Sequence, residues 1–381
     1  MSQQHKIPFT TPFHAPGEIK YVADSLASGL TQGDGPFTAW ATEMLTPLVG
    51  GGKVLLTTSC THSLEMTGLL LGLEPGDEVI LPSFTFVSTV NAYVLRGATP
   101  VFVDVRPDTL NIDERLIEAA VTERTKAIVV VHYGGVACEM DEILAIGAKH
   151  GIPVVEDNAH GLGGRYKGRL LGSLGAMATQ SFHATKNISC GEGGALVIND
   201  AAYLDRAEII REKGTNRSQF FRGAVDKYRW MDVGSSYLPS DILAALLCAQ
   251  LETFDAIQAR RQEIWATYAT ELADWAAAND VSLPTVPEHC EHPAHVFQVL
   301  LPTAEDRARF ITHLADAGIT APFHYVPLHD APVGLRLGRT AGCPVTEDVS
   351  ARLSRLPLFA GLDNADLERV VTAVKAFSSA R

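Results

Sequence analysis

Short apolar runs alternate with longer segments of helical periodicity from residue 53 onward. The apolar runs predict seven strands, at residues 53–57, 78–81, 100–105, 125–131, 152–156, 178–182 and 195–199. The segments between them predict helices at residues 61–72, 86–96, 113–121, 140–150 and 201–212. The middle strands are apolar at almost every position, which is typical of strands buried on both faces. The pattern therefore predicts an α/β fold with a mostly parallel seven-stranded sheet covered by helices.

The pattern changes beyond residue 240. A long helical stretch at residues 241–279 precedes one further strand at residues 296–301 and a last helix at residues 364–377. A proline-rich stretch at residues 283–287 is typical of a hinge or a surface turn. We therefore expect a large α/β domain over residues 1–250 and a small C-terminal α+β domain over residues 251–381.

Composition narrows the class of protein. The chain has 381 residues, of which 46% are hydrophobic and 20% charged, as expected for a globular protein that needs no disulfide or structural metal. The formal net charge of −13 disfavours a nucleic-acid partner or an anionic membrane surface. The six cysteines form no Cys-x-x-Cys pair, and no apolar run reaches the length of a membrane span. We expect a soluble, cytoplasmic protein with reduced thiols.

Candidate chemistry gathers between residues 154 and 194. One apolar strand ends in Glu156 and Asp157 with His160 just beyond, and Lys186 follows the next strand. A lysine beside a buried strand can lose solvation, which lowers its pKa and makes its amine a nucleophile. With a carboxylate for a ring nitrogen, this set is what pyridoxal phosphate needs. Taken singly, Asp157 also fits a turn cap and Lys186 a solvated loop residue.

A phosphate site is available at residues 57–62, where the first strand leads into a helix. The free amides and the dipole at a helix N-terminus favour a dianion, although the same serines and threonines also fit a plain helix cap. The sequence contains neither a P-loop nor a Gly-x-Gly-x-x-Gly dinucleotide fingerprint.

Two histidine groups have more than one interpretation. His289, Cys290, His292 and His295 lie beside prolines, where a solvated turn is the commoner outcome, so we predict no metal site. His324, Tyr325 and His329 could belong to the core or line a substrate pocket.

Several ordered segments resemble the DegT-type sugar-nucleotide aminotransferases, which have the aspartate aminotransferase-like PLP fold (fold type I). They are PGDEVI at residues 75–80, PSFTF at 82–86, VED at 155–157, the segment 181–186 and GEGG at 191–194. The stretches at residues 213–223 and 234–237 look most like the enterobacterial dTDP-4-keto-6-deoxyglucose 4-aminotransferases.

The resemblance implies roles around the cofactor, pyridoxal phosphate alternating with pyridoxamine phosphate. Lys186 would hold it covalently and carry the catalytic proton, Asp157 would pair with its ring nitrogen, and Phe86 would stack on the ring. His160 would lie on the other side of the ring or near the phenolic oxygen, where many relatives have Gln.

The resemblance also implies a phosphate site. The backbone amides of Cys60 and Thr61 and the Ser181 hydroxyl would hold the phosphate. Ser236 occupies the position from which an Asn of many relatives reaches the phosphate across a dimer interface, so its role is less certain than theirs.

The implied reaction is transfer of an amino group from L-glutamate to C4 of dTDP-4-keto-6-deoxy-D-glucose by a homodimer. Lys213, Arg217, Arg222, Tyr325 and His329 would bind the substrate, although the three basic residues also fit solvated surface positions. A pyridoxamine-phosphate-dependent sugar dehydratase is an alternative, against which Lys186 argues because such enzymes have His in its place. A 3-keto sugar aminotransferase and a regulatory protein that only binds the cofactor are further alternatives, and the C4 configuration of the product stays open.

Overall fold

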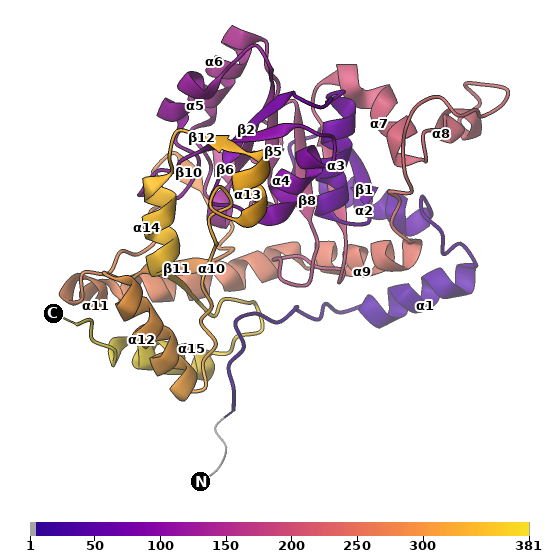
Figure 1. Ribbon diagram of the computed structural model, residues 1–381. Coiled ribbons are helices and arrows are strands. Elements are labelled where there is room, and N and C mark those ends of the chain that lie inside the picture. Colours follow the sequence, from indigo (N-terminus) through magenta and orange to yellow (C-terminus); the bar gives the residue numbers. More distant parts are fainter. Residues whose placement is uncertain (1–4, 381) are drawn as a thin grey trace.

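A central sheet of eight strands in the order β1-β9-β8-β5-β4-β2-β3-β12 organises the computed structural model, which describes residues 5–380 (Figure 1). Its strands are β1 (Lys53–Thr57), β2 (Glu78–Pro82), β3 (Thr99–Val103), β4 (Thr125–Val131), β5 (Val154–Asp157), β8 (Met177–Ser181), β9 (Gly194–Ile198) and β12 (Arg339–Thr340). The seven predicted strands are confirmed. The eighth, β12, comes from the C-terminal part of the chain and is too short to carry a periodic signal.

Strand direction determines where a site can form. β12, β3, β2, β4, β5 and β8 pair in parallel, whereas β9 runs antiparallel to both β1 and β8. The carboxyl ends of the parallel strands therefore meet at one edge of the sheet, which is where open α/β folds bind ligands. Asp157 at the end of β5 and Ser181 at the end of β8 both lie at this edge.

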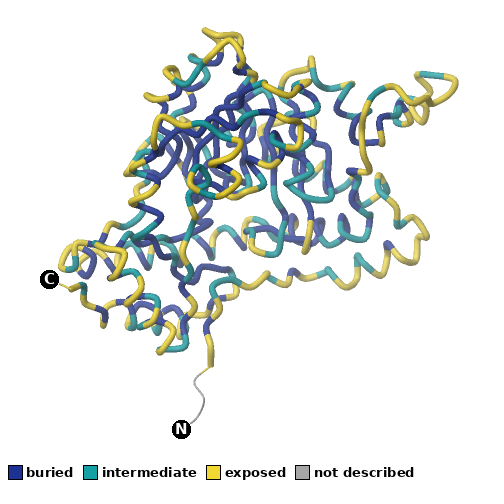
Figure 2. Tube along the Cα trace, viewed as in Figure 1, coloured by how far each residue is buried: buried dark blue, intermediate teal, exposed yellow. Residues whose placement is uncertain are grey.

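The two faces of the sheet follow the period of two along each strand. In β2, Val79 and Leu81 share one hydrophobic cluster, and Ile80 points to the opposite face. The first face is covered by α3 (Cys60–Leu70), α4 (Val87–Val94) and α7 (Leu204–Arg211). The other is covered by α2 (Pro36–Leu48), α5 (Glu114–Ala120), α6 (Met140–His150) and α9 (Asp241–Glu252). Figure 2 shows the strands between these layers as almost wholly buried.

A separate hydrophobic core holds the C-terminal part together. It involves α10 (Phe254–Glu271), α11 (Ala273–Ala278), α12 (Ala304–Asp316), α15 (Asn364–Lys375) and the antiparallel pair β11 (Phe297–Leu300) and β13 (Leu353–Leu356). Ile7 from the other end of the chain is fully buried in this core and bridges to Ile319. The division at residue 250 stays a prediction. Ile7, from before this position, packs in the C-terminal core, and β12, from after it, joins the central sheet.

The other elements are α1 (Glu18–Ser28), α8 (Arg217–Phe221), α13 (Pro332–Leu337), α14 (Pro344–Arg352), β6 (Arg165–Tyr166), β7 (Arg169–Leu170), β10 (Cys290–Glu291) and the short 3₁₀ turns η1 (Tyr133–Gly135) and η2 (Ala201–Tyr203). The predicted helix at residues 241–279 is three helices, because the backbone breaks near Thr253 and again at Leu272. Within residues 5–380, no single helix is long and apolar enough to cross a membrane, although α9 and α10 together meet that test with a bend of 61° between them.

Candidate active site

A cavity of about 510 Å³ opens at the carboxyl edge of the sheet, against the C-terminal part of the chain. Residues from α3, α4, β5, the loop after β8 and β13 line it. Eight of the predicted site residues lie on its wall, namely Cys60, Thr61, Phe86, Asp157, His160, Ser181, Lys186 and Tyr325. The fold therefore brings together residues that are up to 265 positions apart in the sequence (325 − 60).

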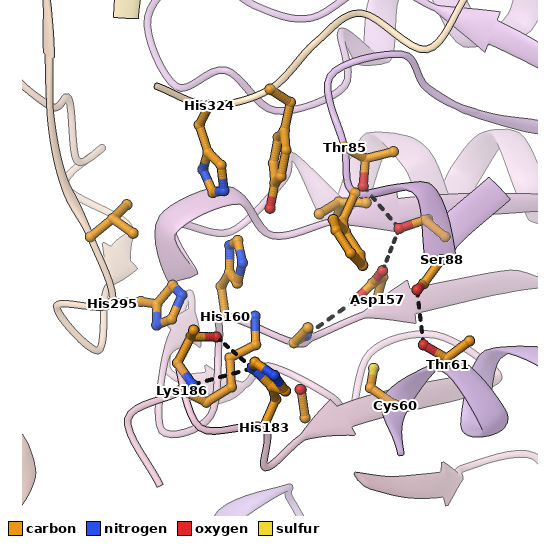
Figure 3. Close-up of a pocket in the computed structure, with 18 of the residues that line it drawn as sticks. Cys60, Thr61, Thr85, Ser88, Asp157, His160, His183, Lys186, His295 and His324 are labelled. Atoms are coloured by element: carbon orange, nitrogen blue, oxygen red, sulfur yellow. Dashed lines mark hydrogen bonds between the residues drawn. The ribbon is translucent and has the colours of Figure 1, made fainter. Parts of the chain in front are cut away.

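Asp157 is a buried carboxylate held in a fixed orientation (Figure 3). The Thr89 hydroxyl donates a hydrogen bond of 2.7 Å to its Oδ2, and the Ala159 amide donates one of 3.2 Å to its Oδ1. The Thr85 hydroxyl lies 2.9 Å from that of Thr89 and extends the chain of contacts. Burial raises the pKa of Asp157, while the Thr89 hydrogen bond and the positive charge of Lys186 oppose the rise. A cationic ring nitrogen bound beside Asp157 would further favour its charged form.

The neighbouring Glu156 has a different task. Its buried carboxylate accepts hydrogen bonds from the amides of Gly172, Leu174 and Gly175 and lies 2.9 Å from His132 Nε2. These partners occupy both oxygens, and Glu156 does not line the cavity. Of the two carboxylates that end the strand, Asp157 alone is available for chemistry in this cavity.

Lys186 lies on the loop that follows β8, and its side chain lines the cavity. β5 and β8 are paired so that Asp157 faces Thr179, which places the loop carrying Lys186 just beyond the edge of the sheet. Its backbone amide donates to the His183 carbonyl at 2.9 Å, and Figure 3 shows its side chain extending between His160 and Asp157. Burial lowers the pKa of Lys186, and the positive charge of Arg355 lowers it further, while Cys60 and Asp157 oppose the shift. A larger share of neutral amine is therefore available to attack a carbonyl.

The loop behind Lys186 is anchored to the C-terminal part. The Asn187 amide group donates to the Pro293 carbonyl at 2.8 Å and to Gln258 Oε1 at 2.9 Å. Its Oδ1 lies 2.8 Å from His295 Nδ1, so that ring nitrogen must carry the hydrogen. These contacts fix the backbone on which Lys186 sits.

The N-terminus of α3 forms the opposite end of the cavity. α3 begins at Cys60, and the Ser59 hydroxyl accepts from the His62 amide at 3.1 Å, so the first helical amides face the cavity without intrahelical partners. The Thr61 hydroxyl donates to Ser88 at 2.8 Å, which places two hydroxyls beside these amides. Burial raises the pKa of the Cys60 thiol to about 12, which keeps it uncharged next to this positive helix end.

Gly194 permits this arrangement because β9 starts directly beneath the turn into α3. A Cβ atom at Gly194 would overlap the backbone of Ser59 and Cys60. Gly194, the last residue of the GEGG segment, is therefore required by the close packing of two backbone segments rather than by a contact with a ligand.

Three imidazoles stack along another wall of the cavity. The rings of His160 and His295 are 4.2 Å apart between centroids with 27° between their planes, and His324 lies 6.2 Å from His160 at 15°. Burial lowers the pKa of each of the three, so they are neutral at pH 7. Phe86 leaves 58% of its surface exposed, so its ring is free to pack on a ligand.

The donor set fits pyridoxal phosphate. Asp157 can hold the ring nitrogen, Lys186 can bond the aldehyde, and the α3 N-terminus with the hydroxyls of Thr61 and Ser88 can bind the dianion. When bound, pyridoxal phosphate supplies the carbonyl that takes up the amino group and a ring that accepts the electron pair of the Cα–H bond.

Five predicted site residues lie away from this cavity in the same chain. Arg222 pairs with Glu208 at 2.6 Å, Arg217 and Lys213 with Glu212 at 3.2 and 3.4 Å, and Ser236 is exposed. His329 bonds Ser83 at 2.7 Å and Glu347 at 3.1 Å. Their assignment to substrate or cofactor stays a prediction. Figure 1 shows α8, between Lys213 and Ser236, at the far side of the molecule from the C-terminal part.

Sequence reasoning missed several residues of the wall, among them Phe9, Ser88, Thr89 and Arg355. Thr89 contacts Asp157 across 68 residues, and a threonine in a helix gives no sign of such a partner. His295 was grouped with a turn, yet it is buried on the cavity wall. In the same stretch, His289 is half-buried rather than fully solvated, and its Nε2 lies 3.1 Å from Glu139 Oε1. Among residues 5–380, no three His, Cys, Asp or Glu side chains gather as metal ligands.

The fold and the cavity together define the class of protein, a pyridoxal-phosphate enzyme of the aminotransferase type. The chain matches the DegT/DnrJ/EryC1/StrS aminotransferase family over residues 14–375 and belongs to that family. It is thus a PLP-dependent aminotransferase.

Solved structures agree with this assignment. The aminotransferase TlmJ from Streptoalloteichus hindustanus is 31% identical, with a TM-score of 0.88 over 97% of this chain and 98% of that one. A sugar aminotransferase, Spr1654 from Streptococcus pneumoniae, is 28% identical in its PMP form, with a TM-score of 0.89 over 97% of each chain. DesV from S. venezuelae is 29% identical, with a TM-score of 0.87 over 97% of this chain and 98% of that one.

Proposed function

We propose that this protein transfers the amino group of L-glutamate to C4 of dTDP-4-keto-6-deoxy-D-glucose, giving a dTDP-4-amino-4,6-dideoxyhexose. The observation that carries the aminotransferase chemistry is the placement of the Lys186 amine and the Asp157 carboxylate on one buried cavity wall. The particular sugar rests on the resemblance of residues 213–223 and 234–237 to the enzymes that act on it.

Each side chain has a defined task in this reaction. Lys186 Nζ takes the proton from Cα of glutamate and, in the second half of the cycle, delivers a proton to C4 of the sugar. Asp157 holds a proton at the cofactor's ring nitrogen, and Thr89 keeps its carboxylate in place. The histidine stack leaves Lys186 as the base of the cavity, because burial lowers the pKa of these imidazoles and makes them poorer proton acceptors.

A homodimer completes the substrate site in this proposal. Between residues 213 and 236, Phe221 leaves 69% and Trp230 leaves 80% of its surface exposed, which is unusual for rings of this size. Lys213, Arg217 and Arg222 lie in the same segment and do not line the cavity of their own chain. In a two-fold dimer, the segment would bury its aromatic rings and bring the basic side chains to the partner's cavity. The sugar diphosphate would then meet arginine guanidinium groups, which suit its geometry.

Separate incubations with 4-keto and 3-keto dTDP-sugars test the proposal. We expect glutamate-dependent formation of the 4-amino sugar and release of 2-oxoglutarate, measured by mass spectrometry. Exclusive conversion of the 3-keto isomer would overturn the position of amination and leave the class intact. Loss of the C3 hydroxyl without gain of nitrogen would indicate the dehydratase instead.

A further inference from the structure

Arg355 on β13 is a cation without an anion in the cavity. Among the described residues that line the cavity it is the only arginine. Its Nη2 donates to the Phe323 carbonyl at 3.0 Å, and its guanidinium carbon lies 4.3 Å from the centre of the Phe9 ring. Its Nε is buried and has no hydrogen-bond partner.

The carboxylates of the cavity wall do not compensate this charge. Asp157 is engaged by Thr89, and Glu192, which is 64% exposed, lies 3.6 Å from His183. Within residues 5–380, the contacts of Arg355 are a carbonyl and an aromatic ring, not an ion pair. A half-buried guanidinium with an unpaired N–H group is costly unless a ligand supplies the acceptor.

We propose that Arg355 binds a carboxylate of the amino donor. This inference rests on the proposed function, because it assigns a site to the glutamate of that reaction. A guanidinium presents parallel N–H groups that match the two oxygens of a carboxylate, and Phe9 holds one face of the plane in position. Lys186 and Arg355 are the only lysine and arginine among the described residues of the cavity wall, so Arg355 is the cation that remains once Lys186 holds the cofactor covalently.

Phe9 itself is held by the C-terminal part. Its carbonyl accepts from the Leu358 amide at 3.4 Å, and Ile7 exchanges hydrogen bonds of 2.9 and 3.0 Å with Gly318 and Thr320. The N-terminal segment therefore fixes the stacking partner of Arg355.

The chain offers a matched control in Arg307. Its Nη1 donates to the Ser350 carbonyl at 3.0 Å, its guanidinium lies 5.9 Å from the Phe323 ring, and its Nε also lacks a partner. Arg307 does not line the cavity. Arg355→Gln and Arg307→Gln thus remove similar structural contacts, and only Arg355→Gln removes a cation from the site.

Two measurements on the cofactor-loaded protein test the proposal. Calorimetry gives the Kd for glutarate, an unreactive dicarboxylate, and rapid-mixing absorbance gives the KM for glutamate in the first half-reaction. We expect Arg355→Gln to raise both at least about tenfold, as for loss of a charged hydrogen bond, and Arg307→Gln to change neither by more than about twofold.

Equal values for the two variants would overturn the proposal, and so would a rise confined to the KM for the ketosugar with the pyridoxamine form. The glutarate titration needs no turnover. A protein that aminates no 4-keto sugar would therefore refute the proposed function without deciding the role of Arg355.

Discussion

The cavity edge of the sheet and the segment 213–236 differ in how far their side chains are buried and fixed within one chain. At the cavity edge, Asp157 is 5% exposed and Thr89 is 1% exposed, and hydrogen bonds fix their orientation. In the segment 213–236, Trp230 is 80% exposed and the basic side chains pair with nearby glutamates at the surface. The candidate groups for proton transfer thus lie within one chain, whereas in the dimer we propose the binding of a large substrate would also depend on a surface covered by a second chain.

The largest expected effect comes from removing the amine at the cavity edge. Lys186→Ala should lower turnover at least about 10³-fold and abolish the visible absorbance of covalently held pyridoxal phosphate. In our proposal the same amine anchors the cofactor and transfers the proton. Steady-state kinetics and absorbance spectra measure this, with the exposed Lys149→Ala as control. Near-normal transamination by Lys186→Ala would contradict the account.

The second effect concerns the carboxylate. Asp157→Asn should lower turnover on the order of 10²-fold while some cofactor remains bound, because a neutral amide no longer stabilises the protonated ring nitrogen. Turnover is compared with cofactor content measured by absorbance after release. Turnover at the unmutated rate would show that Asp157 has no such role.

A third prediction addresses the exposed segment. Phe221→Glu combined with Trp230→Glu should raise the dimer Kd at least about tenfold, because interface aromatics contribute much of the binding energy. Sedimentation velocity over a concentration series measures it, with Leu116→Glu on α5 as control, since Leu116 is 45% exposed on a distant helix. An active monomer of the unmutated protein would contradict the shared site.

The smallest expected effect is on stability against pH. Burial lowers the pKa of His160, His295 and His324 below their ordinary value of 6.5. Below pH 6.5 the unfolded chain binds protons at these rings that the folded chain does not bind. The free energy of unfolding therefore falls as pH falls, by up to about 1.4 kcal/mol per pH unit for each ring. His324→Gln should flatten this slope between pH 6.5 and 5 in urea unfolding, and the exposed His14→Gln should leave it unchanged.

Helices and strands could be predicted from the sequence where the residues at their ends favour a start or a stop. The helix at residues 140–150 matches α6, which ends at Gly151 in a left-handed conformation that favours glycine. Asp157 and Lys186 could be singled out because each follows an apolar strand, and parallel strands deliver their ends to one edge.

Contacts between distant segments could not be predicted in this way. Thr89 supports Asp157 and Phe9 supports Arg355 through folding of the whole chain, and neither pairing leaves a local pattern. His295 lies beside Pro293, which indicated a solvated turn. It is instead buried, and the buried Arg261 donates a hydrogen bond of 2.7 Å from Nη2 to its backbone carbonyl. Lys213, Arg217 and Arg222 pair with glutamates of their own chain and do not line its cavity, which the type of side chain alone could not reveal.

Titration of the pyridoxal-phosphate-loaded protein with L-glutamate tests the central claim most directly. We predict that the visible absorbance of the lysine-bound cofactor disappears as 2-oxoglutarate forms, and that it returns when dTDP-4-keto-6-deoxy-D-glucose is added. A cofactor band that persists at saturating glutamate would contradict the assignment of Lys186 and Asp157 to amino transfer.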